Sequence, residues 1–396
     1  VVASATPPEP EPTKPPPAEP ELEGLWYPLR LEPSTVDPQG AMDPKSSLVI
    51  DQLFEGLYEY RGDGAIEPTG ATGFEVSDDG LLYTIHLRPE AVWSDGQPVV
   101  AQHYVDGVLR LLEPGGDAWQ LYDVEGAEAY NAGEDSDPAT VGIRAVDDHT
   151  LEIRLAARAS YFETILPFDV FYPIRLDLIE AHGERWTEPG NYLSNGSYLL
   201  DAWVHGERVV LVKNPTYWNA NVVRIEKITL PVLQEDASKV DMYEEDELHS
   251  TGEGANLEEV FPRIRANPVL SQELRLLPRP GVHYIGLNTL RAPTDDVLVR
   301  KALASAIDRQ SWLTDAAPAS CTTPPTIKGH QAYGTCGHTF DPEQAQAYLA
   351  EAGYPGGEGF PPLQVWATPT QEDSVQALAA MWEKNLGISV EMRSYE

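Results

Sequence analysis

The sequence predicts a mixed α/β fold in which short β-hairpins and amphipathic helices are interspersed. Two patterns carry this prediction: segments of alternating apolar and polar residues that reverse at polar turns, and apolar residues that recur at helical spacing. Strands and helices do not alternate strictly, so a purely parallel sheet is not expected. A chain of 396 residues with 42% hydrophobic residues can bury the cores of two or three domains.

The predicted elements of residues 25–213 are one strand, two helices and three hairpins. In order they are a strand at 25–31, a helix at 46–57, a hairpin at 74–77 and 82–87, a helix at 99–112, and hairpins at 141–146 and 150–155 and at 197–204 and 207–213. The first helix rests on the spacing of Leu48, Val49 and Leu53. The hairpins rest on alternation around polar turns such as His205-Gly206.

The rest of the chain is predicted to be richer in helices. Strands are expected at 225–232, 282–288 and 388–392, and helices at 261–266, 297–313, 341–353 and 371–386. The helix after Asp341 has a strong start signal, because Pro342 suits the first helical position and Gln344 can complete a capping box. Gly353 is expected to end it.

Charge excludes several classes of protein. The chain carries 27 basic and 63 acidic side chains, a formal net charge of −36. Nucleic acid is not expected as a partner, because neutralising its phosphates needs clustered Lys and Arg. A polybasic membrane-surface protein is excluded for the same reason. No apolar run reaches the roughly 18 residues that a membrane-spanning helix needs.

Residues 1–24 are rich in Pro and Glu and lack hydrophobic periodicity. Proline fixes φ and removes a donor, and the glutamates repel one another, so we expect a disordered, extended tether. The stretch does not have the pattern of a secretory signal peptide. For an exported protein, we therefore expect that signal to have been removed or left out of the sequence.

Motifs for common catalytic and cofactor chemistry are absent from the sequence. It contains no GxxxxGK[ST] phosphate loop, no GxGxxG at a helix start, no HExxH, no GxSxG and no SxxK pair. A glycosidase-type pair of carboxylates cannot be selected, because any two of the many acidic residues would qualify. The sequence therefore predicts no catalytic residue and no cofactor.

The two cysteines, Cys321 and Cys336, allow two interpretations. With His330 and His338 they could bind tetrahedral zinc, but the spacing lacks the short CxxC or HxxxH pairs that preorganise such a site. A disulfide would close the loop between them and would be worth roughly 3 kcal/mol in the chain-entropy model. We favour the disulfide, which indicates an oxidising compartment.

Several aromatic residues suggest a binding cleft or a well-filled core. They are Trp93, Trp119, Tyr122, Trp186, Trp203, Tyr217 and Trp218. Clefts for sugars, peptides or aromatic ligands use such side chains, but packing in the core is the simpler explanation for each.

Four segments resemble, in the same order, the motifs of the extracytoplasmic solute-binding proteins of the peptide- and nickel-binding family. They are ATGFEVSDDGLLYTIHLRPEAVWSDGQPVVAQHYV at 71–105, NGSYLLDAWVHGERVVLVKNPTYW at 195–218, HYIGLNTLRAPTDDVLVRKALASAIDR at 283–309 and FDPEQAQAYLAEAGYPGGEGFPPLQV at 340–365. The likeness extends over most of residues 25–396. Among the subfamilies, the oligopeptide-binding proteins are the most similar.

The resemblance implies a periplasmic-binding-protein type II fold, in which two lobes close on a ligand by hinge motion. Lobe I would hold residues 25–60 and 167–278, with an extra subdomain inserted at 61–166, and lobe II would hold residues 279–396. The family continues with a long stretch that completes lobe II. We therefore expect an incomplete lobe II, a fragment or shortened product, and poor ligand binding by this chain alone.

The resemblance also implies a function. The chain would be the extracytoplasmic substrate-binding component of an ABC transporter, and not an enzyme. It would capture oligopeptides, or a related small solute, between the lobes and deliver them to a membrane permease. We expect a monomer in the periplasm or at the outer face of the cytoplasmic membrane, with a lipid anchor as an open option.

Site residues can be transferred at two places only. Ala41, Met42, Asp43 and Pro44 match the ligand-facing loop of lobe I, and Tyr284 matches an aromatic ligand-facing position of lobe II. A plain connection between strand and helix is the alternative for the loop. A packed strand residue is the alternative for Tyr284.

Two positions depart from the family motif, and several functions stay open. Val100 replaces a capping Thr, which should cost about 1 kcal/mol, and His103 replaces an Asp. A secreted acidic hydrolase with a carboxylate pair in a cleft is the alternative function. Nickel chelates, oligosaccharides, and a chemoreceptor or chaperone-like use of the fold also stay open, but the hairpin and helix signatures favour a transport protein.

Overall fold

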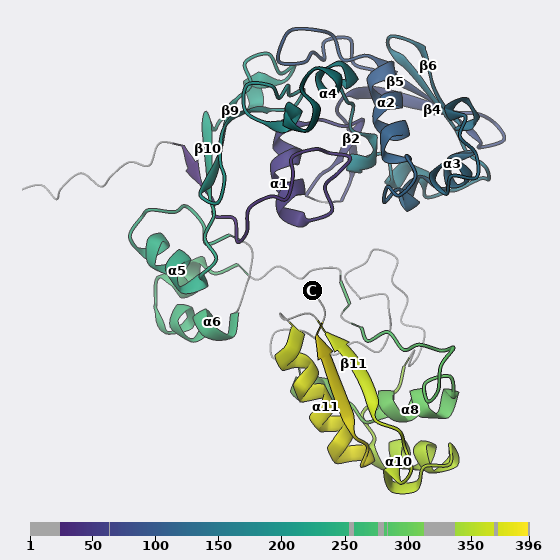
Figure 1. Cartoon of the computed structure of the whole chain (residues 1–396). Coiled ribbons are helices and arrows are strands. Elements are labelled where there is room, and N and C mark those ends of the chain that lie inside the picture. The colour runs from purple at the N-terminus through teal and green to yellow at the C-terminus, as the bar shows by residue number, and fades with distance from the viewer. Residues whose placement is uncertain are drawn as a thin grey trace, which may run out of the picture. The chain divides into compact units, whose positions relative to one another are not determined.

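The computed structural model describes residues 24–62, 64–252, 257–275, 281–282, 284–312, 337–367 and 371–394. The chain divides into two compact units, the first ending at Gln272 and the second beginning at Glu273 (Figure 1). Each unit has a hydrophobic core of its own.

The first unit is built on two four-stranded sheets and a two-stranded ribbon. One sheet has the order β1-β10-β9-β8, the other has the order β4-β5-β7-β6, and β2 pairs with β3. The strands are β1 Leu25–Trp26, β2 Tyr58–Tyr60, β3 Ile66–Pro68, β4 Ala71–Val76, β5 Leu82–Leu87, β6 Ile143–Asp147, β7 Thr150–Arg154, β8 Tyr198–Val204, β9 Arg208–Lys213 and β10 Lys227–Pro231. Neighbouring described strands are antiparallel, except that β1 runs parallel to β10.

The first unit also contains helices. They are α1 Pro44–Leu53, α2 Ala101–Leu111, α3 Ala127–Asn131, α4 Leu176–His182, α5 Asp236–Glu244, α6 Leu257–Ala266 and α7 Leu270–Glu273. Short 3-10 turns lie at Trp119–Leu121, Pro138–Thr140, Phe162–Thr164, Asp169–Phe171, Gly183–Thr187 and Ala220–Val222. Helix α1 packs on β8 and buries Val49, Ile50 and Leu53, because apolar residues at this spacing share one helix face.

The second unit contains a small parallel βαβ arrangement. Strands β11 Leu363–Ala367 and β12 Val390–Ser394 pair in parallel, and the helix α11 Glu372–Leu386 lies between them in the chain. The other helices are α8 Val297–Ser305, α9 Arg309–Trp312 and α10 Pro342–Glu351, and a 3-10 turn lies at Pro355–Gly357. Trp382 joins α11 to α8, because its indole Nε1 donates to the Leu303 carbonyl at 2.9 Å in the core.

The hairpins and the strongest helix signals are confirmed. All three predicted hairpins form, as β4–β5, β6–β7 and β8–β9. Asp341 caps α10 by accepting from the Gln344 N–H at 2.9 Å, and Pro342 holds the first helical position. The chain leaves this helix at Gly353, whose φ of +95° lies in the region that favours glycine.

Other boundaries differ from the prediction. The helix expected at 46–57 begins at Pro44, because Asp43 caps it, and ends at Leu53. The helix expected at 297–313 is broken: Asp308 accepts from the backbone N–H groups of Gln310 and Ser311 and starts α9 as a separate helix.

Two predicted strands are also shorter or absent. The strand expected at 25–31 is regular only at Leu25–Trp26, followed by an isolated bridge from Leu29 to Val232. At 282–288 the described residues form no strand, since none of the described segments pairs with them.

Candidate functional site

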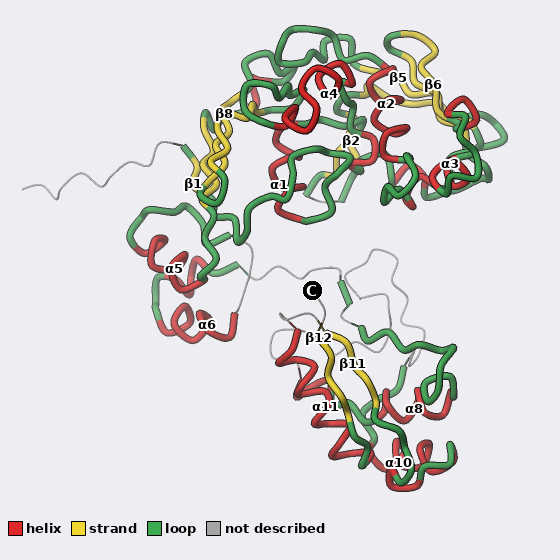
Figure 2. Tube along the Cα trace, in the orientation of Figure 1, coloured by secondary structure: helices red, strands yellow, loops and turns green. Residues whose placement is uncertain are grey.

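The segment between β1 and α1 carries the predicted ligand-facing loop. Residues 27–43 contain no helix and no ladder strand, only turns and the bridge at Leu29 (Figure 2). The loop ends where Asp43 begins α1, with extended backbone at φ −127° and ψ 146°. The loop therefore enters a helix whose start is fixed by its own sequence.

The Asp43 carboxylate is held by hydrogen bonds from its own helix and from the preceding loop. Its Oδ1 accepts from the backbone N–H groups of Lys45 and Ser46, both at 3.1 Å. Its Oδ2 accepts from the hydroxyls of Ser34 at 2.6 Å and Ser46 at 2.7 Å. Asp43 thus ties residue 34 to the first turn of α1, and we call these three residues, Ser34, Asp43 and Ser46, the clasp.

The electrostatics of Asp43 follow from these bonds. Partial burial acts to raise its pKa, but the hydrogen bonds from Ser34 and Ser46, with a smaller contribution from the Lys45 charge, lower the pKa to about 2. The carboxylate is therefore ionised at neutral pH and already satisfied. In the structure this carboxylate positions the loop through its bonds to Ser34 and to the start of α1.

The two residues before Asp43 offer different chemistry. Met42 is 73% exposed, and Ala41 is half-buried. Among the described residues, nothing hydrogen-bonds to the backbone N–H or C=O of Ala41 or Met42. Unpaired main-chain groups beside a fixed helix start are what an extended peptide needs in order to pair as an added strand.

Pro44 and Tyr284 occupy the remaining predicted positions. Pro44 is exposed at the first position of α1, where its missing N–H costs nothing. Tyr284 belongs to the second unit and is 84% exposed, whereas the nearby Ile285 and Leu287 pack against the core of that unit. Tyr284 is therefore a surface aromatic, and a packed position in a strand does not describe it.

The cysteine cluster cannot be placed in the same way. Cys321, His330 and Cys336 lie outside the described residues, so the disulfide stays a prediction. His338 is described, and its ring packs edge-on against Tyr348 with 5.9 Å between ring centroids. Within the described ranges, no group of His, Cys, Asp and Glu side chains has the arrangement of a metal site.

The aromatic residues singled out by the sequence play different roles. Trp93 and Trp186 are core residues with 1% and 4% of their surface exposed, whereas Trp119 is 64% exposed. Tyr122 donates a hydrogen bond to Asn131, and Trp203 donates one to Glu32. Tyr217 and Trp218 both donate to Glu55.

Sequence reasoning missed a buried carboxylate behind the loop. Glu55 follows α1 and is 9% exposed; its carboxylate accepts from the Tyr217 hydroxyl at 2.5 Å and from the Trp218 indole at 2.7 Å. Arg88 stacks over the Trp218 ring, with its Cζ 3.6 Å from the ring centroid. The signal that could have found this cluster is the acidic residue inside the apolar run Leu53-Phe54-Glu55-Gly56-Leu57.

Burial dominates the chemistry of Glu55. It raises the pKa of this carboxyl to about 7, although the hydrogen bonds from Tyr217 and Trp218 and the charge of Arg88 act in the opposite direction. The amide of Asn195 pairs with the Glu55 backbone, donating to its C=O at 2.8 Å and accepting from its N–H at 3.2 Å. The cluster joins segments that are far apart in sequence, which is a structural role.

Two compact mixed α/β units, together with a loop whose main-chain groups at residues 41–42 have no partner among the described residues, suit a protein that binds an extended ligand. Comparison with known proteins agrees. Residues 65–396 match the bacterial extracellular solute-binding proteins, family 5 Middle. The chain belongs to this family of solute-binding proteins and is not an enzyme, so the hydrolase alternative is set aside.

Two curated relatives are each 32% identical to the chain over the aligned residues. A probable deoxycholate-binding periplasmic protein of Escherichia coli, YgiS, is 32% identical over 93% of this chain and 71% of its own length. The oligopeptide-binding protein OppA of Bacillus subtilis is 32% identical over 93% of this chain and 70% of its own length.

Solved structures share the fold. The murein tripeptide binding protein MppA of Escherichia coli has a TM-score of 0.80 at 29% identity, with 94% of this chain and 75% of that chain covered. OppA of Haemophilus influenzae, in complex with RPPGFSPFR, has a TM-score of 0.78 at 27% identity, with 95% and 76% covered. These likenesses confirm the predicted periplasmic-binding-protein type II fold.

The family also confirms that the protein acts outside the cytoplasm. Within the described ranges, no helix combines the length and the apolar character that crossing a bilayer would require.

Proposed function

We propose that this chain captures oligopeptides outside the cytoplasm for delivery to the membrane permease of an ABC importer. The main-chain groups of Ala41 and Met42, which lie beside the clasp and have no hydrogen-bond partner in the described part of the chain, carry the proposal. Relatives named as oligopeptide-binding proteins support it, as does the likeness to a solved oligopeptide ABC transporter component of Borrelia burgdorferi.

Main-chain pairing explains how one site can take many peptides. An extended peptide that pairs with the N–H and C=O groups at residues 41–42 is bound through atoms that every peptide has. Side chains then extend into surroundings where water can fill the space that a small residue leaves. In this proposal the clasp keeps the loop in place and Met42 supplies an apolar contact.

The domain assignment follows the same proposal. Residues 25–60 and 167–278 would form lobe I, 61–166 the inserted subdomain and 279–396 lobe II. We further propose that the protein is monomeric, carries the Cys321–Cys336 disulfide and acts near the outer face of the membrane, where a lipid anchor would retain it. Mass measurement with and without a reducing agent, and light scattering, test the disulfide and the monomer.

The main-chain contact can be tested with a matched pair of variants. Met42→Pro removes the N–H donor of residue 42, whereas Met42→Ala removes only the side chain. Saturation-transfer NMR with tri-, tetra- and penta-alanine detects weak as well as tight binding. We expect Met42→Pro to bind the peptides about tenfold more weakly than the parent, as loss of one hydrogen bond predicts. Met42→Ala should bind them less than threefold more weakly.

Two results would contradict the proposal. Absence of any signal with all peptides at millimolar concentration would exclude peptide capture by the chain. Equal binding by Met42→Pro and the parent would exclude the loop as the contact. Deoxycholate belongs in the same experiment, because one relative is named for it. A signal with deoxycholate and none with peptides would mean that the substrate resembles deoxycholate and is not a peptide.

A further inference from the structure

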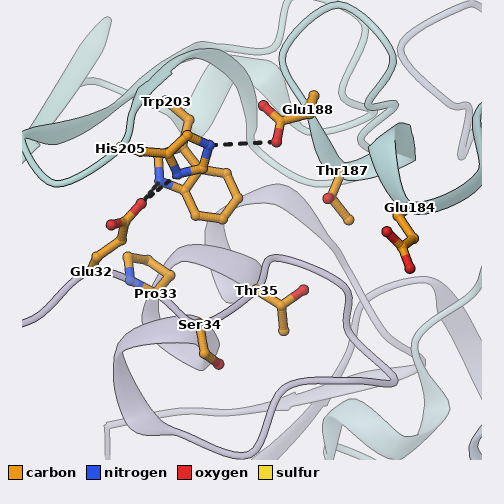
Figure 3. Close-up of a pocket in the computed structure, with 9 residues that line it drawn as sticks. All are labelled: Glu32, Pro33, Ser34, Thr35, Glu184, Thr187, Glu188, Trp203 and His205. Atoms are coloured by element: carbon orange, nitrogen blue, oxygen red, sulfur yellow. Dashed lines mark hydrogen bonds and ion pairs between the residues drawn. The ribbon is translucent and has the colours of Figure 1, made fainter.

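A cavity of about 430 Å³ lies in the first unit beside the clasp (Figure 3). One wall is residues 32–35 of the loop before α1, and the opposite wall is formed by Glu184, Thr187 and Glu188. Trp203 and His205, from the end of β8 and its turn, close the space between the two walls. Three separate segments of the chain therefore converge on it.

One of the three carboxylates of this cavity is part of its framework. Glu32 accepts from the Trp203 indole at 2.8 Å and from the Gly206 N–H at 2.9 Å, and its Oε1 lies 2.6 Å from His205 Nδ1. Burial opposes ionisation, but these hydrogen bonds lower the pKa of Glu32, and the bond to Glu32 raises the pKa of His205. This pair fixes the hairpin turn against the loop.

The other two carboxylates, Glu184 and Glu188, can accept further hydrogen bonds or ion pairs. Glu188 has a single described ion-pair partner, His205 Nε2 at 3.5 Å, and Glu184 has no ion pair among the described residues. Among the described residues, no Lys or Arg lines the cavity. With His205 protonated, three carboxylates and one imidazolium give a net charge of −3 + 1 = −2, and with His205 neutral the charge is −3.

The remaining walls suit an alkyl chain that carries a charge. In Figure 3 the benzene ring of Trp203 points toward the space between Thr187 and Thr35, and the ring of Pro33 lies on the same side as Glu32. The His205 ring packs against the Trp203 indole, with 4.6 Å between ring centroids, and the rest of the indole ring can pack against methylene groups. The hydroxyls of Thr35 and Thr187 add acceptors. Anions are disfavoured because three carboxylates line the cavity and His205 is the single lining side chain among the described residues that can become cationic.

The cavity is connected directly to the predicted ligand loop. Ser34 lines the cavity, and its hydroxyl donates to Asp43 Oδ2 at 2.6 Å within the clasp. Asp43 directly follows Met42, the residue with unpaired main-chain groups. A group bound in the cavity would therefore lie against the same residues that hold the loop.

We propose that this cavity is a binding subsite for an ammonium or guanidinium group on an alkyl chain, received by Glu184 and Glu188 against Trp203. Such a group has two sources: a Lys or Arg side chain of a captured peptide, or a free alkylamine. The first source rests on the proposed peptide-binding function, and the second does not.

The first experiment uses a free amine and the full chain. Cadaverine is titrated into the protein by calorimetry at low and at physiological ionic strength, with 1-pentanol as the uncharged probe. We expect cadaverine to bind and 1-pentanol not to bind. The double variant Glu184→Gln, Glu188→Gln should bind cadaverine at least tenfold more weakly, as loss of two charge-assisted contacts predicts. Glu180→Gln, a matched change at an exposed site on α4, should leave it unchanged.

Three outcomes overturn the subsite. Cadaverine that does not bind excludes it, and equal weakening by Glu180→Gln and the double variant shows a diffuse effect of the net charge. If 1-pentanol binds as tightly as cadaverine, the cavity is an apolar pocket that does not recognise charge. A perturbation of the Trp203 indole N–H signal in NMR spectra upon cadaverine addition, lost in the double variant, would support the assigned location.

A second experiment identifies the source of the cation. Alanine pentapeptides with one Lys are compared with the same peptides carrying norleucine, which has an alkyl chain of equal length and no charge. A Lys preference of about tenfold that disappears in the double variant supports a peptide side chain as the occupant. Cadaverine binding without a Lys preference supports a free amine. If cadaverine binds while no peptide does, the proposed function fails and the subsite stands.

Discussion

Two carboxylates mark the two ends of helix α1, and their surroundings affect them in opposite ways. Asp43, at the start, accepts from two backbone N–H groups and two hydroxyls, and its pKa is about 2. Glu55, just past the end, accepts from two donors in a nearly dry site, and its pKa is about 7. Dense local hydrogen bonding outweighs partial burial at Asp43, whereas desolvation prevails at Glu55.

The difference teaches what each end of the helix contributes. Backbone N–H groups converge at a helix start, so an acidic residue there is stabilised by atoms that the helix itself supplies. Past the helix end, Glu55 depends on Tyr217, Trp218 and Arg88, which come from distant segments. Asp43 therefore holds the predicted ligand loop through neighbouring residues, whereas Glu55 joins distant segments inside the first unit.

The largest expected effect is the loss of the Glu55 side chain. Glu55→Ala leaves the Tyr217 hydroxyl and the Trp218 indole without their acceptor and opens a cavity beside Arg88. We expect the first unit to lose about 3–5 kcal/mol of its free energy of unfolding, as breaking a buried charged network does. Denaturant unfolding measures this. A loss below about 1 kcal/mol would show that the cluster is dispensable.

The pH dependence of stability should have opposite signs at the two ends. The folded pKa of Glu55, about 7, exceeds its ordinary 4.5, so its contribution is present below pH 4.5 and is lost as pH rises through 7. That loss is on the order of 3 kcal/mol. The folded pKa of Asp43, about 2, is below its ordinary 3.8, so its contribution is present above pH 3.8 and is lost as pH falls toward 2.

Glu55→Gln and Asp43→Asn separate these two effects. Unfolding is measured from pH 3 to pH 8, and each variant is compared with the parent. The parent should lose stability relative to Glu55→Gln between pH 4.5 and 7, and relative to Asp43→Asn below pH 4. Parallel curves for Glu55→Gln and the parent would mean that this carboxyl titrates normally.

A smaller effect is expected from the helix cap itself. Asp43→Ala removes the acceptor for the N–H groups of Lys45 and Ser46 and should cost about 1–2 kcal/mol. Asp43→Asn retains an acceptor but loses the negative charge, and the fall of the pKa from 3.8 to about 2 corresponds to about 2 kcal/mol for that charge. We therefore expect similar losses for the two variants in thermal unfolding at neutral pH. A much smaller loss in Asp43→Asn would show that the cap, and not the charge, is what stabilises the start of α1.

The smallest effect concerns a helix that starts without a side-chain cap. Val100 precedes α2 and offers no acceptor, but the His103 Nδ1 accepts from its backbone N–H at 3.1 Å. Val100→Thr supplies the missing acceptor and should stabilise the protein by about 0.5–1 kcal/mol. Val100→Ala is the control that adds none. A gain in both variants would assign the effect to side-chain size.

At His103 the family motif predicts an Asp, and the structure shows what the histidine does in its place. The sequence identified it as a departure from the family's Asp, and the structure shows that a neutral imidazole does similar work. Burial, assisted by the charge of Arg175, lowers the pKa of His103 to about 4, so its Nδ1 stays an acceptor at neutral pH. That acceptor also takes the Trp93 indole N–H at 3.2 Å.

Several features of the protein were determined by the sequence alone. The three hairpins, the Asp341 cap with Pro342, and the end of α10 at Gly353 all depend on neighbouring residues. The family followed from four motifs that are contiguous in the chain. Alternation, helical periodicity and capping act over a few residues, so they can be recognised before any tertiary contact is known.

Only the tertiary structure decided how the acidic residues are used. Asp43 belongs to the loop predicted to face a ligand, and only the structure shows that its carboxylate also accepts from Ser34 and from the start of α1. Glu55 acquires partners 162 and 163 residues away, and the cavity beside Trp203 is lined by three separate segments. Burial and donor geometry depend on which distant segments pack together, and local patterns do not contain that information.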